Sequence, residues 1–314
     1  MIHITIQNFE SELIQASARS PVLLDIWAPW CGPCKSLSPV LEKLEREYAG
    51  RFTLAKLNSD EQPEIAGQLS QAFGVRSIPF CVLLDQGQPV DGIVGAQPEA
   101  QIREFLDRHV PTSEDAQAEA QAEEAEVLEA EGDTDAALAK LQQAVAVAPG
   151  NDVARCDYVK LLLELKRVPQ ARMAFDPIAG KGALDSRIAA LGLWLQACEK
   201  APSLRSVDAL RAAVAANRRD FDARYELAQG HFAAGRFTDA MDELLEIVMR
   251  DKQWNEQLAR RAYVAILDLM SKPAPKAAVP EAAKGALEVA GKPAAAPGDP
   301  VVDQYRRKLS MALF

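Results

Sequence analysis

The stretch Trp27-Ala-Pro-Trp30-Cys31-Gly-Pro-Cys34-Lys35 decides the fold of the first third of the chain. It follows the apolar run Val22-Leu-Leu-Asp-Ile-Trp27, which is typical of a buried strand. The glycine and proline between the cysteines favour the start of a helix. A helix N-terminus has unpaired backbone N–H groups and a positive partial charge, and both stabilise a thiolate. We therefore expect Cys31 to be a nucleophile and Cys34 to be the thiol that resolves a mixed disulfide.

Two charged residues flank this motif in predicted strands. Asp25 lies within the apolar run, where burial of a carboxylate is costly and raises its pKa. It is a candidate proton acceptor for Cys34, directly or through a water molecule. Lys56 lies in the next predicted strand, Phe52–Leu57, and is the expected charge partner of Asp25.

The surrounding residues, 1–110, predict an α/β domain. Strand and helix patterns alternate over the ranges 2–6, 22–27, 37–48, 52–57, 78–84 and 99–110. Gln86-Gly-Gln-Pro89 lies between two strand-like runs and predicts an antiparallel hairpin. Pro79 stands at the start of an apolar strand, where proline favours a cis bond near a site. We expect the Ile78-Pro79 bond to be cis and to face Cys31.

After Val110 the composition changes to that of an all-α solenoid. Glu114 to Glu131 holds eight acidic residues and no basic ones, which is typical of a solvated helix face. Apolar positions then recur at a spacing of 34 residues, the length of a tetratricopeptide repeat. The first set is Ala125, Leu128, Ala137, Leu141 and Ala144, and the second is Val159, Leu162, Ala171, Phe175 and Ile178. We predict about four helical hairpins over 114–271, the third of them degenerate.

The last part of the chain predicts a tether and a helix. Residues 272–300 hold six of the 19 prolines among alanines and lysines, a composition typical of a flexible linker. Residues 301–314 regain helical periodicity, with apolar side chains on one face. This helix either caps the last repeat or docks on a partner.

Whole-chain composition excludes several classes of protein. The 314 residues suffice for two or three domains, and the formal net charge of -10 disfavours nucleic acid. We see neither a basic leader nor an apolar run of about 18 residues, so we expect no export and no membrane contact. Among five cysteines only Cys31 and Cys34 are close together, which favours a reducing cytoplasm. The histidines His3, His109 and His231 are too dispersed for a metal site, and we expect neither metal nor cofactor.

The remaining cysteines are expected to be packing residues. Cys156 and Cys198 fall in apolar helical contexts, where a free cysteine behaves as a small core residue. Cys81 lies two residues beyond Pro79 and reads as strand core, with a redox-sensing third thiol as the alternative.

Residues 1–110 resemble thioredoxin. The Trp-Cys-Gly-Pro-Cys motif is intact, and Asp25, Lys56, Pro79 and Gly95 stand where that family has its buried Asp, its Lys, its cis-proline and its late glycine. The resemblance implies a thiol–disulfide oxidoreductase. Its peptide groove would be formed by Trp30, Gly32, Pro33, Ile78 and Gly95.

The order of the parts resembles the bacterial chaperedoxin family of YbbN/CnoX-type co-chaperones. That resemblance implies a protein that holds unfolding or oxidatively stressed clients and protects or reduces their cysteines. It also implies transfer of clients to the chaperonin GroEL and the Hsp70 system, with thioredoxin reductase or glutathione as reductant. The terminal helix is implicated in docking, through Tyr305, Arg306, Arg307, Leu309, Leu313 and Phe314.

Two other functions fit the same sequence. One is a dedicated thioredoxin-like disulfide reductase whose repeats recruit a single substrate protein. The other is a pure holdase or assembly factor in which the cysteine pair is incidental.

Overall fold

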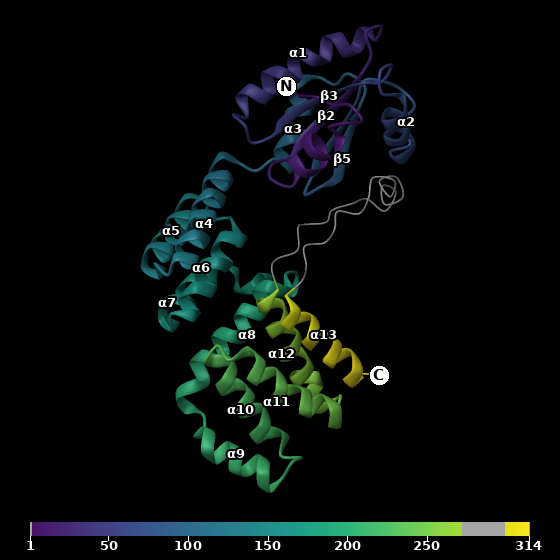
Figure 1. Ribbon diagram of the computed structural model, residues 1–314. Coiled ribbons are helices and arrows are strands. Elements are labelled where there is room, and N and C mark those ends of the chain that lie inside the picture. Colours follow the sequence, from purple (N-terminus) through teal and green to yellow (C-terminus); the bar gives the residue numbers. More distant parts are fainter. Residues whose placement is uncertain (1, 272–298, 314) are drawn as a thin grey trace. The chain divides into compact units, whose positions relative to one another are not determined.

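The computed structural model describes residues 2–271 and 299–313, which group into two compact units (Figure 1). The first unit ends at Ala116 and the second begins at Gln117. The linker predicted over 272–300 lies outside the described residues except for its last two, and Phe314 lies outside them too.

The first unit is built on a five-stranded sheet with the order β1-β3-β2-β4-β5. Its strands are β1 Ile2–His3, β2 Val22–Trp27, β3 Thr53–Asn58, β4 Phe80–Asp85 and β5 Gln88–Val94. β3 pairs in parallel with β1 and β2, whereas β4 runs antiparallel to β2 and forms the predicted hairpin with β5. The central strands are apolar almost throughout because helices cover both faces of the sheet.

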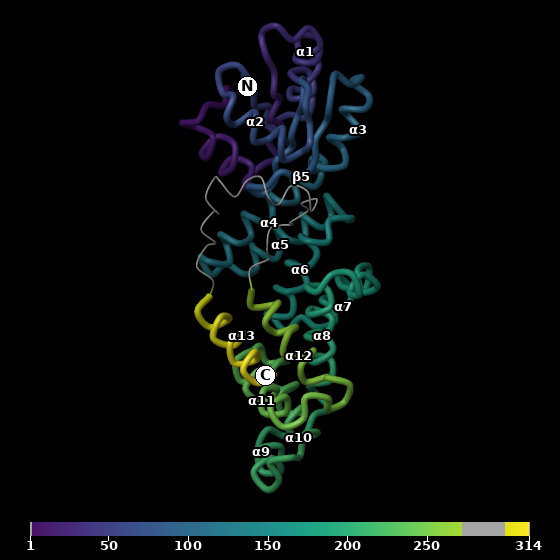
Figure 2. The backbone as a smooth tube through the Cα atoms, turned by 90° about the vertical axis from the view of Figure 1, so that its right-hand side faces the viewer, coloured from purple at the N-terminus to yellow at the C-terminus, as the bar shows by residue number. Residues whose placement is uncertain are grey.

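The helices of this unit divide between the two faces. They are α1 Gly32–Glu47, α2 Pro63–Ala72 and α3 Glu99–His109, with a π-helical segment at Glu10–Gln15. Leu24 and Ile26 of β2 pack with α2 and the π-helical segment, and Leu23 packs with α1 and α3. Figure 2 shows α2 and α3 on opposite sides of the sheet. Because side chains alternate along a strand, Asp25 lies on the same face as Leu23, under α1.

The second unit is helical in every described segment of regular structure. Its helices are α4 Ser113–Glu131, which begins in the first unit, α5 Thr134–Val147, α6 Asp152–Glu164, α7 Val168–Phe175, α8 Ser186–Lys200, α9 Val207–Ala216, α10 Phe221–Ala233, α11 Phe237–Arg250, α12 Trp254–Met270 and α13 Pro300–Leu313. Short 3₁₀ segments follow α7 and α8, at Asp176–Ala183 and Ala201–Ser203. The predicted order, an α/β unit followed by an all-α unit, is therefore confirmed.

The turns that join the helices follow the repeat period: Lys166 lies 34 residues after Gly132, and Gly235 lies 69 residues after Lys166, one more than two periods. Gly132, Lys166 and Gly235 have φ of 86°, 59° and 79°, the left-handed conformation that ends a helix sharply. After each turn the next backbone N–H bonds to a carbonyl five residues earlier, as from Arg167 to Leu162 at 2.8 Å. Lys166 Nζ also donates to the carbonyl of Ala233 at the end of α10, at 2.9 Å.

The third hairpin differs from the others. At Lys200, where the period would place its turn, φ is -78° and a 3₁₀ segment follows. α9 packs on α10, while α8 packs against α6, α10 and α12. α8 is therefore a central helix of the unit and α9 a peripheral one.

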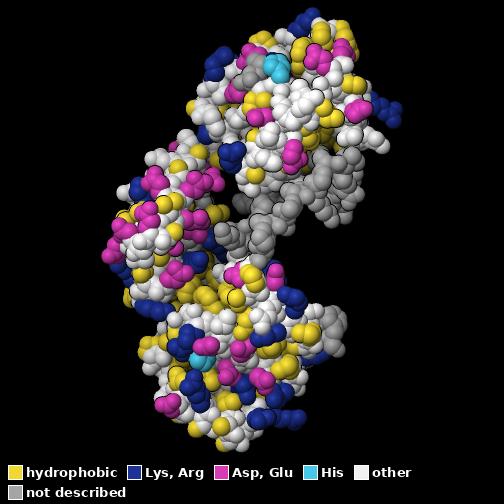
Figure 3. All heavy atoms as spheres, viewed as in Figure 1, with side chains coloured by type: hydrophobic (Ala, Val, Ile, Leu, Met, Phe, Trp, Pro, Cys, Tyr) yellow, Lys and Arg dark blue, Asp and Glu magenta, His cyan; other side chains and the backbone are white. Residues whose placement is uncertain are grey.

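The acidic stretch 114–131 forms the exposed surface of α4. Ala118 and Ala125 of this helix are buried, and most of its carboxylates are exposed. Figure 3 shows acidic side chains gathered over α4 and α5 on the face in view. The interpretation of this stretch as a solvated helix face agrees with its burial pattern.

The terminal helix α13 packs on the repeats. Val302, Tyr305 and Leu309 are buried in the core that α11 and α12 share. The Tyr263 hydroxyl donates to the Tyr305 carbonyl at 2.8 Å. The capping interpretation therefore accounts for Tyr305 and Leu309, and these two side chains are not at the surface as the docking interpretation requires.

The remaining docking residues lie farther out on the same helix. Arg306 and Arg307 are exposed, and Leu313 is half-buried. Docking through α13 stays a prediction, and it now concerns the outer face of the helix.

We expect Leu309→Ala to lower the free energy of unfolding of the second unit by about 2–4 kcal/mol, because it leaves a cavity between α13 and its neighbours. Urea denaturation followed by circular dichroism measures this loss. Met311→Ala, at an exposed position of the same helix, is the matched control and should change stability by less than about 0.5 kcal/mol. Equal effects of the two changes would contradict the packing of α13.

Candidate functional site: a dithiol–disulfide centre

The two cysteines of the motif lie at the N-terminus of α1. Cys31 is the N-cap residue, and Cys34 lies in the first helical turn. Their sulfurs form a disulfide with an S–S distance of 2.02 Å. The backbone N–H of Cys34 donates to Cys31 Sγ at 3.2 Å, so a helix-end donor points at the predicted nucleophile. Gly32 and Pro33 form the start of α1 between them.

The loop that precedes β4 lies against this pair, because β4 runs antiparallel to β2 and begins at the end of the sheet where β2 finishes. The Ile78-Pro79 bond is cis, as predicted, and Ile78 packs on the two cysteines and Ala28. Gly95, with φ of 78°, donates its N–H to the Pro79 carbonyl at 2.8 Å. The structure therefore brings Gly95, Ile78 and Pro79 together beside the disulfide.

An open groove of about 830 Å³ runs beside the motif. It is lined by Trp30, Ser59, Ser70, Gln71, Gly74, Val75, Arg76, Ser77 and Ile78. Trp30 is 69% exposed, and its indole N–H donates to the Asp60 carboxylate at 3.1 Å. Of the predicted groove residues, Trp30 and Ile78 line this groove, whereas Gly32, Pro33 and Gly95 do not.

Asp25 is fully buried under α1. Burial raises its pKa from 3.8 to about 6, against the opposing effects of the Lys56 charge and of hydrogen bonds from Ser38 and Cys81. A carboxyl group with a pKa of about 6 can both accept and release a proton near neutral pH. This is the property that the sequence analysis expected of a proton acceptor for Cys34.

Lys56 acts on Asp25 without forming an ion pair with it. The two residues are opposite each other in the β2–β3 register. The Lys56 ammonium pairs with Glu42 of α1 at 2.8 Å. The positive charge of Lys56 still lowers the pKa of Asp25, while Glu42 raises it. Glu42 is thus a member of the charge network that sequence reasoning missed.

Sequence reasoning also missed the two hydrogen-bond donors to Asp25. Ser38 Oγ lies 3.4 Å from Asp25 Oδ2, and Cys81 Sγ lies 3.8 Å from Oδ1. Ser38 is one helical turn after Cys34, a spacing that could have pointed to it. Cys81 was read as strand core, and it is both buried and in contact with the carboxylate.

Comparison with known proteins agrees with this geometry. The thioredoxin family model matches residues 1–108. The chain is 43% identical to thioredoxin of Haemophilus influenzae over 110 residues. The aligned region covers 35% of this chain and 97% of that protein. The chain therefore belongs to the thioredoxin family. It is 44% identical to thioredoxin of Chlorobaculum thiosulfatiphilum over 106 residues, and this aligned region covers 34% of this chain and 93% of that protein.

The second unit has its own relatives. Tetratricopeptide repeat models match residues 128–194 and 200–279. The architecture is thus a thioredoxin domain followed by tetratricopeptide repeats. The two matches leave residues 195–199 between them. This gap lies close to Lys200, where the turn of the third hairpin departs from the 34-residue period.

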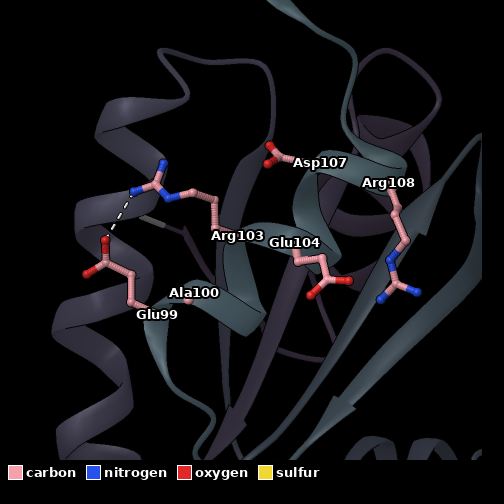
Figure 4. Close-up of a pocket in the computed structure, with 6 residues that line it drawn as sticks. All are labelled: Glu99, Ala100, Arg103, Glu104, Asp107 and Arg108. Atoms are coloured by element: carbon pink, nitrogen blue, oxygen red, sulfur yellow. Dashed lines mark hydrogen bonds and ion pairs between the residues drawn. The ribbon is translucent and has the colours of Figure 1, made fainter.

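Other features of the described residues add no second reactive centre to the thioredoxin domain. No group of three metal-binding side chains is found in residues 2–271 and 299–313, and no helix there is long and apolar enough to cross a membrane. Figure 4 shows a second hollow along α3, lined by Glu99, Ala100, Arg103, Glu104, Asp107 and Arg108. Within it Arg103 pairs with Glu99 at 3.1 Å, and each of these two residues also pairs with a residue of α1.

We expect the contribution of Asp25 to the stability of the thioredoxin domain to fall as pH rises through its titration. The folded pKa of about 6 exceeds the ordinary value of 3.8, so the folded state favours the proton, and the Asp25 contribution to stability is full only below pH 3.8 and is lost as pH rises through about 6. Relative to Asp25→Asn, the oxidised wild-type protein should lose about 2 kcal/mol between pH 4 and 7. Denaturant titrations across this range measure the difference.

The control for this prediction is Gln101→Ala, which changes an exposed uncharged side chain of the same domain. Its stability should follow the wild-type pH dependence. A constant difference between wild type and Asp25→Asn from pH 4 to 7 would contradict the raised pKa.

Proposed function

We propose that this protein is a chaperedoxin. Its thioredoxin domain exchanges disulfides with client proteins, and its repeats hold those clients while they are unfolding or oxidatively stressed. The observation that carries the proposal is the joined Cys31–Cys34 pair beside an open groove, in the same chain as a helical repeat array. Solenoids of this kind expose extended binding surfaces.

The redox step starts from the reduced pair. The Cys31 thiolate attacks one sulfur of a client disulfide, that S–S bond breaks, and the other client sulfur leaves as a thiolate. Cys34 gives its proton to Asp25 and attacks Cys31 Sγ, the bond between Cys31 and the client breaks, and the Cys31–Cys34 disulfide forms. Two electrons pass to the client. Thioredoxin reductase or glutathione then returns the pair to the dithiol.

Holding of clients is assigned to the second unit. It exposes large apolar side chains, among them Leu184, which is 94% exposed, and the methionines Met173 and Met249. Methionine side chains adapt to varied apolar partners. These positions support contact with unfolded segments of diverse sequence.

Transfer to the chaperonin GroEL is assigned to the outer face of α13, with the Hsp70 system as a further recipient. Tyr305 and Leu309 are occupied in packing, so Arg306, Arg307 and the half-buried Leu313 remain of the predicted docking residues that the structure describes. To these we add the exposed Met311. We place the protein in the cytoplasm. Its three free cysteines, Cys81, Cys156 and Cys198, are unpaired and buried, which suits a reducing compartment.

A dedicated disulfide reductase is the second candidate. It is favoured by the 43% identity to a thioredoxin over almost that protein's whole length. In this case the repeats would recruit a single substrate protein. The two candidates share the redox step and differ in the number and kind of proteins bound.

We expect the full-length protein to reduce insulin disulfides and Cys31→Ser to show no turnover above background, since it lacks the nucleophile. Cys34→Ser should accumulate mixed disulfides. The double variant Cys31→Ser/Cys34→Ser should still suppress aggregation of citrate synthase, as measured by light scattering, because holding does not use the cysteines. Loss of suppression in the double variant would contradict an independent holding surface.

We expect Cys34→Ser protein to capture the chaperonin non-covalently from bacterial lysate, together with many disulfide-trapped clients. Adding Arg307→Glu and Met311→Glu should remove the chaperonin and leave the trapped clients, because both changes lie on the outer face of α13. Met173→Glu, at an exposed methionine elsewhere in the repeats, is the control and should retain it. A single trapped partner with no chaperonin would favour the dedicated reductase.

A further inference from the structure

We propose that Cys81 is a positioning residue of the redox centre: its thiol and the Ser38 hydroxyl clamp the Asp25 carboxylate from two sides and hold it as an ionised acceptor for the Cys34 proton. This inference rests on the disulfide exchange proposed above. It gives a chemical role to a thiol that the exchange itself does not use.

The clamp follows from the register of the sheet. Cys81 of β4 stands directly opposite Asp25 of β2, so the two side chains share the face under α1. The Cys81 thiol reaches Asp25 Oδ1 at 3.8 Å, a separation suited to a sulfur donor. Ser38 reaches the other oxygen, Oδ2, from α1 at 3.4 Å. The two donors thus engage different oxygens from different layers of the domain.

The same geometry connects the clamp to the resolving cysteine. Cys34 and Ser38 are separated by four residues in α1 and lie on one side of the helix. The Cys81 thiol holds the Asp25 carboxylate next to Ser38, and therefore on the side of α1 that carries Cys34. Proton transfer depends on this placement, because a general base must reach the proton that it removes.

Cys81 is suited to donate and unsuited to react. It is 1% exposed and belongs to the apolar core with Leu23 and Leu37. Burial and the neighbouring carboxylate raise the pKa of its thiol well above 9.0, so it stays protonated and keeps its S–H donor. The redox-sensing alternative needs an accessible thiolate, and this environment supplies neither access nor the charge.

The other groups that act on Asp25 come from two further elements. Lys56 of β3 lowers its pKa through its positive charge, and Glu42 of α1 raises it. Lys56 and Glu42 pair with each other, so their effects on the carboxylate partly cancel. The hydrogen bonds from Ser38 and Cys81 favour the ionised form of Asp25 without adding a net charge to the core.

The expected effect on the reaction has a definite sign. In resolution the Cys34 proton moves to Asp25, the Cys34 sulfur bonds to Cys31 Sγ, and the client sulfur leaves. Loss of the Cys81 donor destabilises the ionised carboxylate, so its pKa rises and it becomes protonated at higher pH. The rate of resolution falls at the pH where Asp25 becomes protonated. Without the Cys81 donor, this fall should occur at a higher pH.

The test compares Cys81→Val, which is somewhat larger and has no donor, with Cys81→Ala, which is smaller and has no donor, and with Cys81→Ser, which restores a hydroxyl donor. The full-length reduced proteins are titrated by ¹³C NMR of the aspartate carboxyl groups, with Asp25→Asn to assign the resonance. Cys81→Val and Cys81→Ala should raise the Asp25 titration midpoint by about half a pH unit or more, and Cys81→Ser should recover most of the difference. Cys156→Ala, a buried cysteine of the second unit, is the matched control and should leave the midpoint unchanged.

A second readout separates this inference from the proposed function. The pH profile of mixed-disulfide resolution, measured in single turnovers, should shift with the NMR midpoint in the same variants. Unchanged Asp25 midpoints in Cys81→Val and Cys81→Ala would overturn the clamp even if disulfide exchange proceeds normally. If the wild-type protein exchanges no disulfides while the midpoints shift as expected, the redox function fails and the clamp stands.

Discussion

The junction between β2 and α1 is the constraint on which the redox centre depends. β2 is buried on both faces, so its last residues are held firmly, and α1 begins five residues after it ends. That short connection fixes Cys31 at the end of a helix where backbone donors are unpaired. It also lays α1 over Asp25, so that one helix supplies the resolving thiol, Ser38 and Glu42. A change in the start of α1 would displace all of these groups at once.

Much of this centre could be predicted from the sequence because its parts are local. The spacing of Cys31 and Cys34, the strand before them and the buried Asp25 are all visible in a few consecutive residues. The cis bond before Pro79 was predictable because proline is costly in a strand. Glu42 and Cys81 were not found as functional residues because their contacts with Lys56 and Asp25 depend on register and helix placement between distant segments.

Much of the repeat unit could also be predicted from the sequence, because its signals are local or recur at a fixed spacing. The 34-residue period marks residues that face one core, and turns at Gly132 and Gly235 mark helix ends. The placement of α13 was not predictable, since an apolar stripe fits capping and docking equally well. What decides it is the surface that α11 and α12 leave open, which receives Tyr305 and Leu309.

The bond from Lys166 to the Ala233 carbonyl has a consequence for how the repeat unit unfolds. It joins the turn of the second hairpin to the end of α10, across the degenerate hairpin between them. α8 likewise contacts α6, α10 and α12. In an ordinary solenoid each repeat touches only its neighbours, so opening can spread gradually from one end. Here the second and later hairpins share contacts, so we expect them to melt as one cooperative block, with partial unfolding confined to peripheral pieces such as α9.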